Sequence, residues 1–233
     1  MIEIVLRGRG KNALGTSLMT ELCQELERAQ NSPVLLRGDA GCFSSGLDLK
    51  EVSELSPDEM RRFLALLEDL TLELFLHPAP TVAWVNGHAI AGGCVLALCC
   101  DHRVASDDTR TRIGLNEVAL GVRFPPRVMA LAKYRVPRHA IERVLLGAEL
   151  HDPAQALKLG LVDELCADAE RVAKERLAAL AEHPREAYAA AKRSLRAGVL
   201  EPTADERSRF EREDLPVWTS EAVRARIRAI FKR

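Results

Sequence analysis

The sequence predicts an α/β fold, and three observations carry this prediction. Short apolar or β-branched runs, bounded by glycine or proline, alternate with helical patterns through the first half of the chain. From about residue 126 the strand signal fades, and alanine-rich helical stretches take over. The 233 residues are 47% hydrophobic, which is enough to form one core without disulfides or a metal. We therefore expect strands packed against helices.

The first half of the chain supplies the strands. They are predicted at residues 2–6, 34–36 and 82–85. Between the first two strands, Leu18, Leu22 and Leu26 keep helical spacing. A second helix is predicted to begin at Ser56, because Pro57 and two acidic residues follow this capping residue.

The C-terminal third is predicted to be mostly helical. The predicted helices cover residues 137–146, 153–159, 168–182, 184–197, 203–214 and 220–231. Basic and apolar side chains are interspersed along the last of them, which is typical of a helix that packs one face and exposes the other. We find no repeat or long linker, so residues 1–233 are expected to form a single domain.

Charge and composition exclude several classes of function. The chain has 33 Lys and Arg against 34 Asp and Glu, and this net charge of -1 argues against a nucleic-acid-binding surface. Aromatic residues make up 4%, which leaves few rings to stack on bases. No apolar run approaches the ~18 residues that span a bilayer, and the N-terminus does not resemble a signal peptide. We expect a soluble, cytoplasmic protein without a membrane span.

Familiar motifs for cofactors, metals and nucleophiles are absent from the sequence. The glycines near residue 10 do not fit the dinucleotide-binding pattern, and there is no P-loop, zinc-protease or serine-hydrolase motif. The six histidines lack metal-ligand spacing. The six cysteines form no C-x-x-C pair, so we expect them to be small core residues. The sequence predicts no metal site and no cofactor.

Two glycine-rich segments are candidates for a binding site. Residues 41–50 (GCFSSGLDLK) and 86–95 (NGHAIAGGCV) each follow a predicted strand and lead toward a helical or apolar stretch. Small residues there let a ligand approach the backbone, and the unpaired N–H groups of a helix start attract an anion. Two such turns meeting at one carbonyl oxygen would form an oxyanion hole. On spacing alone, two ordinary helix starts explain the segments equally well.

The same segments carry a resemblance to a known family. Residues 44–51 (SSGLDLKE) and 86–94 (NGHAIAGGC) resemble the two signature turns of the crotonase superfamily, the enoyl-CoA hydratases and isomerases. Further similarity lies in residues 11–14, 100–105 and 156–163. The resemblance implies a spiral of ββα units over residues 1–165. It also implies C-terminal helices over residues 166–233 that assemble a homotrimer or a dimer of trimers.

The resemblance also implies a substrate and a site. The substrate would be an acyl-CoA thioester, with its oxygen held by the backbone N–H groups of Leu47 and Gly92. The residues expected to contact it are Ser45, Gly46, Asp48, Leu49 and Asn116. Two roles stay open for Asn116: contact with the acyl or pantetheine part of the substrate, or a cap on the helix that carries Glu117.

The acid and base groups over the acyl chain decide the reaction. Hydratases of the family place one glutamate three residues after the oxyanion glycine and a second on a later segment. In this chain the first position is Val95 and the second is Glu117. One carboxylate can move a proton from C2 to C4, whereas adding water needs a second group to hold it. We therefore expect a 3,2-enoyl-CoA isomerase of fatty-acid β-oxidation, with Glu117 as the proton shuttle.

Burial is expected to tune this carboxylate. Since Glu117 lies among apolar residues such as Val95 and Val118, its pKa should be raised toward neutrality. Two alternatives remain: another crotonase reaction on an acyl-CoA, such as hydration or decarboxylation, and a non-catalytic acyl-CoA-binding or structural subunit. A glutamate that faces an acyl tunnel would favour an enzyme, and one turned to solvent would favour the binding subunit.

Overall fold

The computed structural model describes residues 1–231, and its central layer is a parallel β-sheet. The five strands lie in the order β1-β2-β3-β5-β7, and every neighbouring pair is parallel. Their bounds are Ile2–Leu6 (β1), Val34–Gly38 (β2), Thr81–Val85 (β3), His102–Ser106 (β5) and Glu164–Cys166 (β7). A parallel sheet is covered on both faces, which explains why its central strands are almost continuously apolar.

A second, shorter β layer makes the chain a spiral. It consists of the parallel pair β4 (Ala89–Ile90) and β6 (Ile113–Gly114) and of isolated bridges that join Leu14 to Leu47, Ser44 to Ala89 and Ile113 to His151. After β2, β3 and β5, the chain therefore adds a short segment to this layer before its next helix, whereas after β1 Leu14 joins the layer just behind a helical turn at Arg9–Asn12. The spiral of ββα units implied by the resemblance is present, and it brings the segment after β2 beside the segment after β3.

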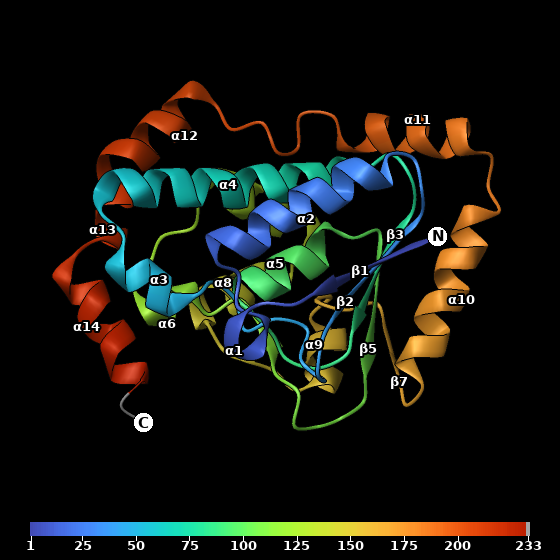
Figure 1. The fold of residues 1–233 in the computed structure, drawn as a ribbon, viewed down its shortest axis with the longest axis horizontal. Coiled ribbons are helices and arrows are strands. Elements are labelled where there is room, and N and C mark those ends of the chain that lie inside the picture. Colours follow the sequence, from blue (N-terminus) through green and yellow to red (C-terminus); the bar gives the residue numbers. More distant parts are fainter. Residues whose placement is uncertain (232–233) are drawn as a thin grey trace.

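Helices cover both faces of the main sheet (Figure 1). Their bounds are Arg9–Asn12 (α1), Thr16–Ala29 (α2), Leu49–Glu54 (α3), Pro57–Leu76 (α4), Gly92–Cys99 (α5), Glu117–Leu120 (α6), Pro126–Arg135 (α7), Ile141–Gly147 (α8), Pro153–Lys158 (α9), Ala169–Ala181 (α10), Arg185–Arg196 (α11), Ala204–Arg209 (α12), Leu215–Trp218 (α13) and Glu221–Ile230 (α14). The larger core packs α2, α4 and α5 against one face of the sheet. On the other face, α10 packs against Leu35, Val82 and Val104.

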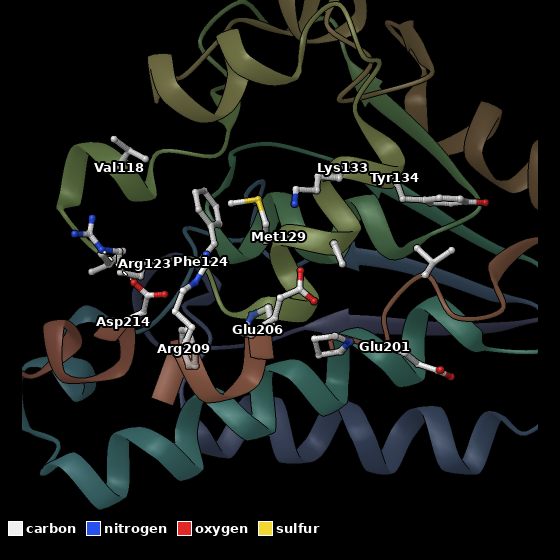
Figure 2. A pocket seen from close by; sticks show the side chains of 16 residues that line it. Val118, Arg123, Phe124, Met129, Lys133, Tyr134, Glu201, Glu206, Arg209 and Asp214 are labelled. Atoms are coloured by element: carbon white, nitrogen blue, oxygen red, sulfur yellow. Dashed lines mark ion pairs between the residues drawn. The ribbon is translucent and has the colours of Figure 1, made fainter. Parts of the chain in front are cut away.

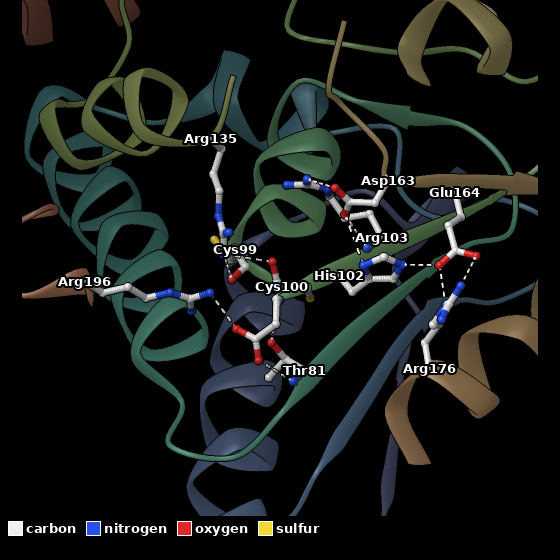
Figure 3. Close-up of polar contacts among 11 residues, drawn as sticks. Thr81, Cys99, Cys100, His102, Arg103, Arg135, Asp163, Glu164, Arg176 and Arg196 are labelled. Atoms are coloured by element: carbon white, nitrogen blue, oxygen red, sulfur yellow. Dashed lines mark hydrogen bonds and ion pairs between the residues drawn. The ribbon is translucent and has the colours of Figure 1, made fainter. Parts of the chain in front are cut away.

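The structure confirms the predicted strands and adds four that the sequence did not predict: β5 and β7 in the main sheet, and β4 and β6 in the shorter layer. β5 begins with two polar residues, His102 and Arg103. Their partners are Asp163 and Glu164, at the start of the neighbouring strand β7. His102 Nε2 is 2.7 Å from Glu164 Oε1, and Arg103 Nη2 donates to Asp163 Oδ1 at 2.6 Å (Figure 3). Pairing across the strands thus makes polar residues compatible with the edge of the sheet.

Three helical predictions are corrected. The helix α7 was not predicted; Pro126 occupies its first turn, where proline is tolerated. The helix predicted from residue 137 begins at Ile141, after a turn in which Pro137 O accepts from the backbone of Ala140. The helix predicted over 203–214 is interrupted by a π-helical turn at Phe210–Asp214.

A buried ionic cluster fixes the C-terminal helices to the sheet. Asp101, just before β5, accepts from Lys192 Nζ at 2.8 Å and from Arg196 Nη2 at 2.5 Å. The backbone N–H of Thr81 also donates to Asp101 Oδ2, at 2.8 Å, and Figure 3 labels Thr81 and Arg196 in this cluster. Burial alone would raise the pKa of Asp101, but the two cations outweigh it and the pKa is lowered. From this anchor, α12, α13 and α14 return along α4 toward α3 and α6 (Figure 1).

Candidate active site

A mostly apolar cavity of about 200 Å³ lies where the two glycine-rich segments meet the C-terminal helices. It is lined by Ser45, Leu47, Leu49, Val52, Leu67, Ile90, Ala91, Gly92, Val95, Asn116, Glu117, Leu120, Val122, Pro125, Val128, Leu150, Trp218, Ile227 and Ile230. Ser45, Asn116 and Glu117 are the polar side chains of this lining, apart from the indole N–H of Trp218. The cavity is therefore suited to an apolar chain lying beside one carboxyl group.

Two backbone N–H groups are available at this cavity. Leu47 and Gly92 both line it, and within residues 1–231 neither N–H has an acceptor. Gly92 is the first residue of α5, so its N–H has no partner inside the helix. A Cβ placed on Gly92 would lie 3.6 Å from Leu47 N, which shows that the two groups are neighbours. Together they can donate to one carbonyl oxygen, as the donors of an oxyanion hole do.

Unusual backbone geometry holds the two segments together. Gly46 has a φ of +89°, and a Cβ there would come within 2.7 Å of Ile90 O, so glycine is required for this close approach. Ala91 has a φ of 48°, a conformation that costs about 1–3 kcal/mol for a residue other than glycine. It is held by hydrogen bonds at both ends, from Ala91 N to Gly114 O at 2.8 Å and from Val95 N to Ala91 O at 2.9 Å. These bonds fix the direction of the first N–H groups of α5.

Glu117 is a buried carboxyl group, and no cation among residues 1–231 contributes to its pKa. It begins α6, is 7% exposed, and its Oε2 has no hydrogen-bond partner among the described residues. Burial raises the pKa of Glu117 from 4.5 to about 8, in the direction expected from the sequence. A carboxyl group with this pKa can both accept and return a proton near neutral pH. Val95 lines the same cavity and supplies no second carboxylate.

Val118 is not part of the surroundings of Glu117, and this expectation was wrong. Its side chain is 46% exposed and lines a separate hollow of about 530 Å³ beside α7. Figure 2 shows that basic residues such as Lys133 and Arg209 share this hollow with acidic ones such as Glu206. Because the charges of its lining balance and it contains no buried carboxyl group, the hollow is not the candidate site.

Asn116 occupies the N-cap position of α6, but its side chain does not cap the helix, which excludes one of the two roles left open for this side chain. Its side chain makes no capping hydrogen bond, and its Oδ1 is buried without a partner in the described part of the chain. The residue lines the cavity next to Glu117. The geometry therefore favours the other role, contact with a bound molecule.

The remaining predicted residues divide into two groups. Ser45 and Leu49 line the cavity, whereas Gly46 and Asp48 do not. The carboxylate of Asp48 caps α3 by accepting from Lys50 N and Glu51 N. Asp48 and Gly46 therefore shape the turn that presents Leu47, and their contact with a ligand stays a prediction.

The sequence did not identify four buried apolar residues that also line the cavity. Leu67, Val128, Trp218 and Ile227 come from four different helices and are all buried. In the sequence they occupy ordinary core positions at helical spacing, and no motif marks them. Only the return of the C-terminal helices onto α4 and α7 brings them together.

Other kinds of site find no support in residues 1–231. No three His, Cys, Asp or Glu residues gather there in a way that could hold a metal ion. Nor does this part of the chain contain a helix of the length and apolarity that a membrane crossing requires. Cys42, Cys94, Cys99 and Cys100 are buried, as predicted for core residues, while Cys23 and Cys166 are half-buried.

The comparisons with known proteins agree with this fold. A family model described as Enoyl-CoA hydratase/isomerase matches residues 1–224. The chain belongs to this family and has the crotonase fold.

Both isomerases and hydratases are among the relatives. The chain is 36% identical over 176 residues to human "Enoyl-CoA delta isomerase 1, mitochondrial", a match that covers 73% of the chain and 58% of the relative. It is 35% identical over 163 residues to a "Putative enoyl-CoA hydratase" of Thermus thermophilus, covering 66% and 63%. The matched region thus spans less than two thirds of these curated relatives.

Solved structures give the same picture over nearly the whole chain. The crystal structure of human mitochondrial delta3-delta2-enoyl-CoA isomerase superposes with a TM-score of 0.91 at 28% identity, covering 99% of this chain and 93% of that one. An enoyl-CoA hydratase from Bacillus halodurans gives a TM-score of 0.84 at 27% identity, covering 97% and 95%. Membership of the family therefore does not by itself decide the reaction.

Proposed function

We propose that this protein is a 3,2-enoyl-CoA isomerase, which moves the double bond of a 3-enoyl-CoA to position 2. One observation carries the proposal: among residues 1–231, Glu117 is the single carboxyl group in the lining of a mostly apolar cavity, beside two unpaired N–H groups. Isomerisation needs one group that takes and returns a proton, whereas hydration also needs a group that holds water. The similarity to named isomerases supports the same choice.

The proposed mechanism uses two parts of the chain. The N–H groups of Leu47 and Gly92 donate to the thioester oxygen, and ionised Glu117 removes a proton from C2. The electron pair of the broken C–H bond moves onto the thioester oxygen and forms an enolate, which the two donors stabilise. Glu117 then returns its proton to C4, and the double bond forms between C2 and C3. No atom is gained or lost, and no cofactor is needed beyond the CoA of the substrate.

Hydration of a 2-enoyl-CoA is the second candidate, since one observation favours it. The buried Oδ1 of Asn116 is an acceptor without a partner among residues 1–231, and it lies next to Glu117 in the sequence. Such a group could hold a water molecule for a one-glutamate hydratase. A non-catalytic subunit is favoured less, because Glu117 lines the cavity and is not turned to solvent.

The assembly, pathway and location complete the proposal. We propose that the C-terminal helices assemble a homotrimer or a dimer of trimers, as the family resemblance implies, and that the reaction serves fatty-acid β-oxidation. A cytoplasmic location stays a prediction, since the human relative is named as mitochondrial.

Isomerisation should depend on pH in the direction that Glu117 sets. Only its ionised form can take a proton from C2, and burial raises its pKa to about 8. The kcat/KM for 3-hexenoyl-CoA should therefore rise about tenfold per pH unit below pH 8 and level off above it. Steady-state rates with a coupled hydratase that consumes the 2-enoyl product would measure this. A profile that is flat from weakly acidic pH upward argues against Glu117 as the base, and no turnover at any pH rejects the proposed function.

A further inference from the structure

The segment behind α6 is tied to the C-terminal helices by one hydrogen bond. Residues 121–125 join α6, which carries Glu117, to α7 without regular secondary structure. The segment bonds back to α6 through Val122 N, which donates to Glu117 O at 3.2 Å. Among the hydrogen bonds of residues 1–231, only that from Trp218 Nε1 to Arg123 O, at 3.1 Å, ties it to an element other than α6 and α7. The position of the segment therefore depends on Trp218.

The helix α6 is too short to fix Glu117 by itself. It has four residues, and a single helical turn is unstable without contacts from outside. Two of the four, Val118 and Ala119, are exposed, so this side of α6 receives little support. The N-terminal end of α6 follows β6, which pairs with β4. Its other end is held through residues 121–125.

A π-helical turn precedes the two side chains that reach Arg123. The turn lies at Phe210–Asp214, and Pro216 follows it closely. In a regular α-helix a proline ring clashes with the carbonyl four residues earlier, so a wider turn accommodates it. Asp214 and Trp218 are four residues apart, which places them on one side of the helix. Both contact Arg123: Asp214 Oδ1 lies 3.5 Å from its Nε (Figure 2), and Trp218 binds its carbonyl.

Of these two contacts, the hydrogen bond from Trp218 is the firmer one. The side chain of Arg123 is 56% exposed, so solvent weakens its ion pair with Asp214. Trp218 is 3% exposed and ends α13, which packs against α4. Its indole N–H therefore holds the Arg123 carbonyl from a fixed position.

We propose that Trp218 is a positioning residue for the reaction: its N–H holds the Arg123 carbonyl and thereby fixes the segment behind α6 and the direction of the Glu117 side chain. Trp218 acts through Glu117 and takes no part in the bond changes itself. The inference rests on the proposed function, because that function gives Glu117 a proton to move.

The test compares Trp218→Phe with the unaltered protein and with Trp84→Phe. Phenylalanine keeps a buried ring but cannot donate to Arg123 O. In Trp218→Phe, kcat for 3-hexenoyl-CoA should fall by about ten- to a hundredfold, the loss expected when a catalytic group is misplaced by about 1 Å. The KM should change much less, because the N–H groups of Leu47 and Gly92 are unaffected. Trp84 is the other tryptophan of the chain and packs against the core on the far face of the sheet, so Trp84→Phe should keep both constants.

The pH profile separates positioning from loss of stability. Burial raises the pKa of Glu117 to about 8, and a loosened α6 would let water reach the carboxyl group. In Trp218→Phe the break in kcat/KM should therefore move to lower pH. Loss of folded protein alone would lower the rate at every pH and leave the break in place. If Trp218→Phe does not fold, Asp214→Ala loosens the same segment and should move the break in the same direction by a smaller amount.

The outcomes for Trp218 and for the isomerase are distinguishable. Carbon-13 NMR of protein labelled at its glutamate carboxyl groups titrates Glu117 without any reaction, and Glu117→Gln identifies its signal. If the unaltered protein turns over no 3-enoyl-CoA, the proposed function fails, while a lower pKa of this signal in Trp218→Phe still supports the positioning role. An unchanged pKa of Glu117 in Trp218→Phe, or a kcat that does not fall in an active isomerase, overturns the positioning role.

Discussion

Glu117→Gln should lower kcat/KM for isomerisation of 3-hexenoyl-CoA by about 10²–10⁴-fold, the contribution of a general acid–base group. Glutamine keeps the shape of the side chain but cannot take a proton from C2. No other carboxyl group lines the cavity, so nothing in the site described can replace it. The measurement is a steady-state assay at a pH above 8, where the carboxyl group of the unaltered protein is ionised.

Two controls give this result its meaning. Binding of saturated hexanoyl-CoA should persist in Glu117→Gln, because the N–H groups of Leu47 and Gly92 are unaffected. The matched variant Glu182→Gln, at an exposed position after α10, should keep full turnover. If Glu117→Gln isomerises 3-hexenoyl-CoA at a normal rate, Glu117 is not the proton shuttle.

The same substitution should make the protein more stable at alkaline pH. The pKa of Glu117 is raised from 4.5 to about 8, so between these values the folded chain binds more protons at this site than the unfolded chain does. Its contribution to stability therefore falls as the pH rises through this window. Above pH 8, Glu117→Gln should increase the free energy of unfolding in urea by on the order of 2–4 kcal/mol. Loss of activity together with a gain in stability would separate a catalytic role from structural damage.

Asp101→Asn should destabilise the protein by about 3–5 kcal/mol, the usual cost of breaking a buried ion pair by removing one partner. Asp101 is 9% exposed and neutralises both Lys192 and Arg196, whose side chains are 6% and 4% exposed. Without its charge, two cations remain buried and α11 loses its anchor on the sheet. Chemical denaturation of both proteins at neutral pH measures the difference.

An exposed ion pair provides the control for this second prediction. Asp58 lies 2.9 Å from Arg61, and its side chain is 80% exposed, so Asp58→Asn should cost less than about 1 kcal/mol. If Asp101→Asn costs no more than Asp58→Asn, the cluster around Asp101 does not hold the C-terminal helices in place.

The sequence predicts well those features that depend on neighbouring residues. The strand runs near the N-terminus, the capping box at Ser56 and the two glycine-rich turns are all local patterns, and the structure contains each of them. The burial of Glu117 also follows from its apolar neighbours, although Val118 points away from it because α6 is a single short turn.

Features that depend on contacts between residues distant in the sequence could not be predicted from local patterns. In β5, His102 and Arg103 pair with Glu164 and Asp163, which are distant in the sequence. Similarly, Trp218 reaches the cavity only through the packing of α13 on α4. Local pattern could not distinguish these residues from ordinary loop and core positions.

The most direct test of the central claim compares two substrates with one preparation of the protein. Isomerisation of 3-hexenoyl-CoA is followed through a coupled hydratase, and hydration of crotonyl-CoA is followed by the mass of its product. With Glu117 as the single acid–base group, isomerisation should be faster by about a hundredfold or more. Hydration of crotonyl-CoA at a comparable rate would contradict the account.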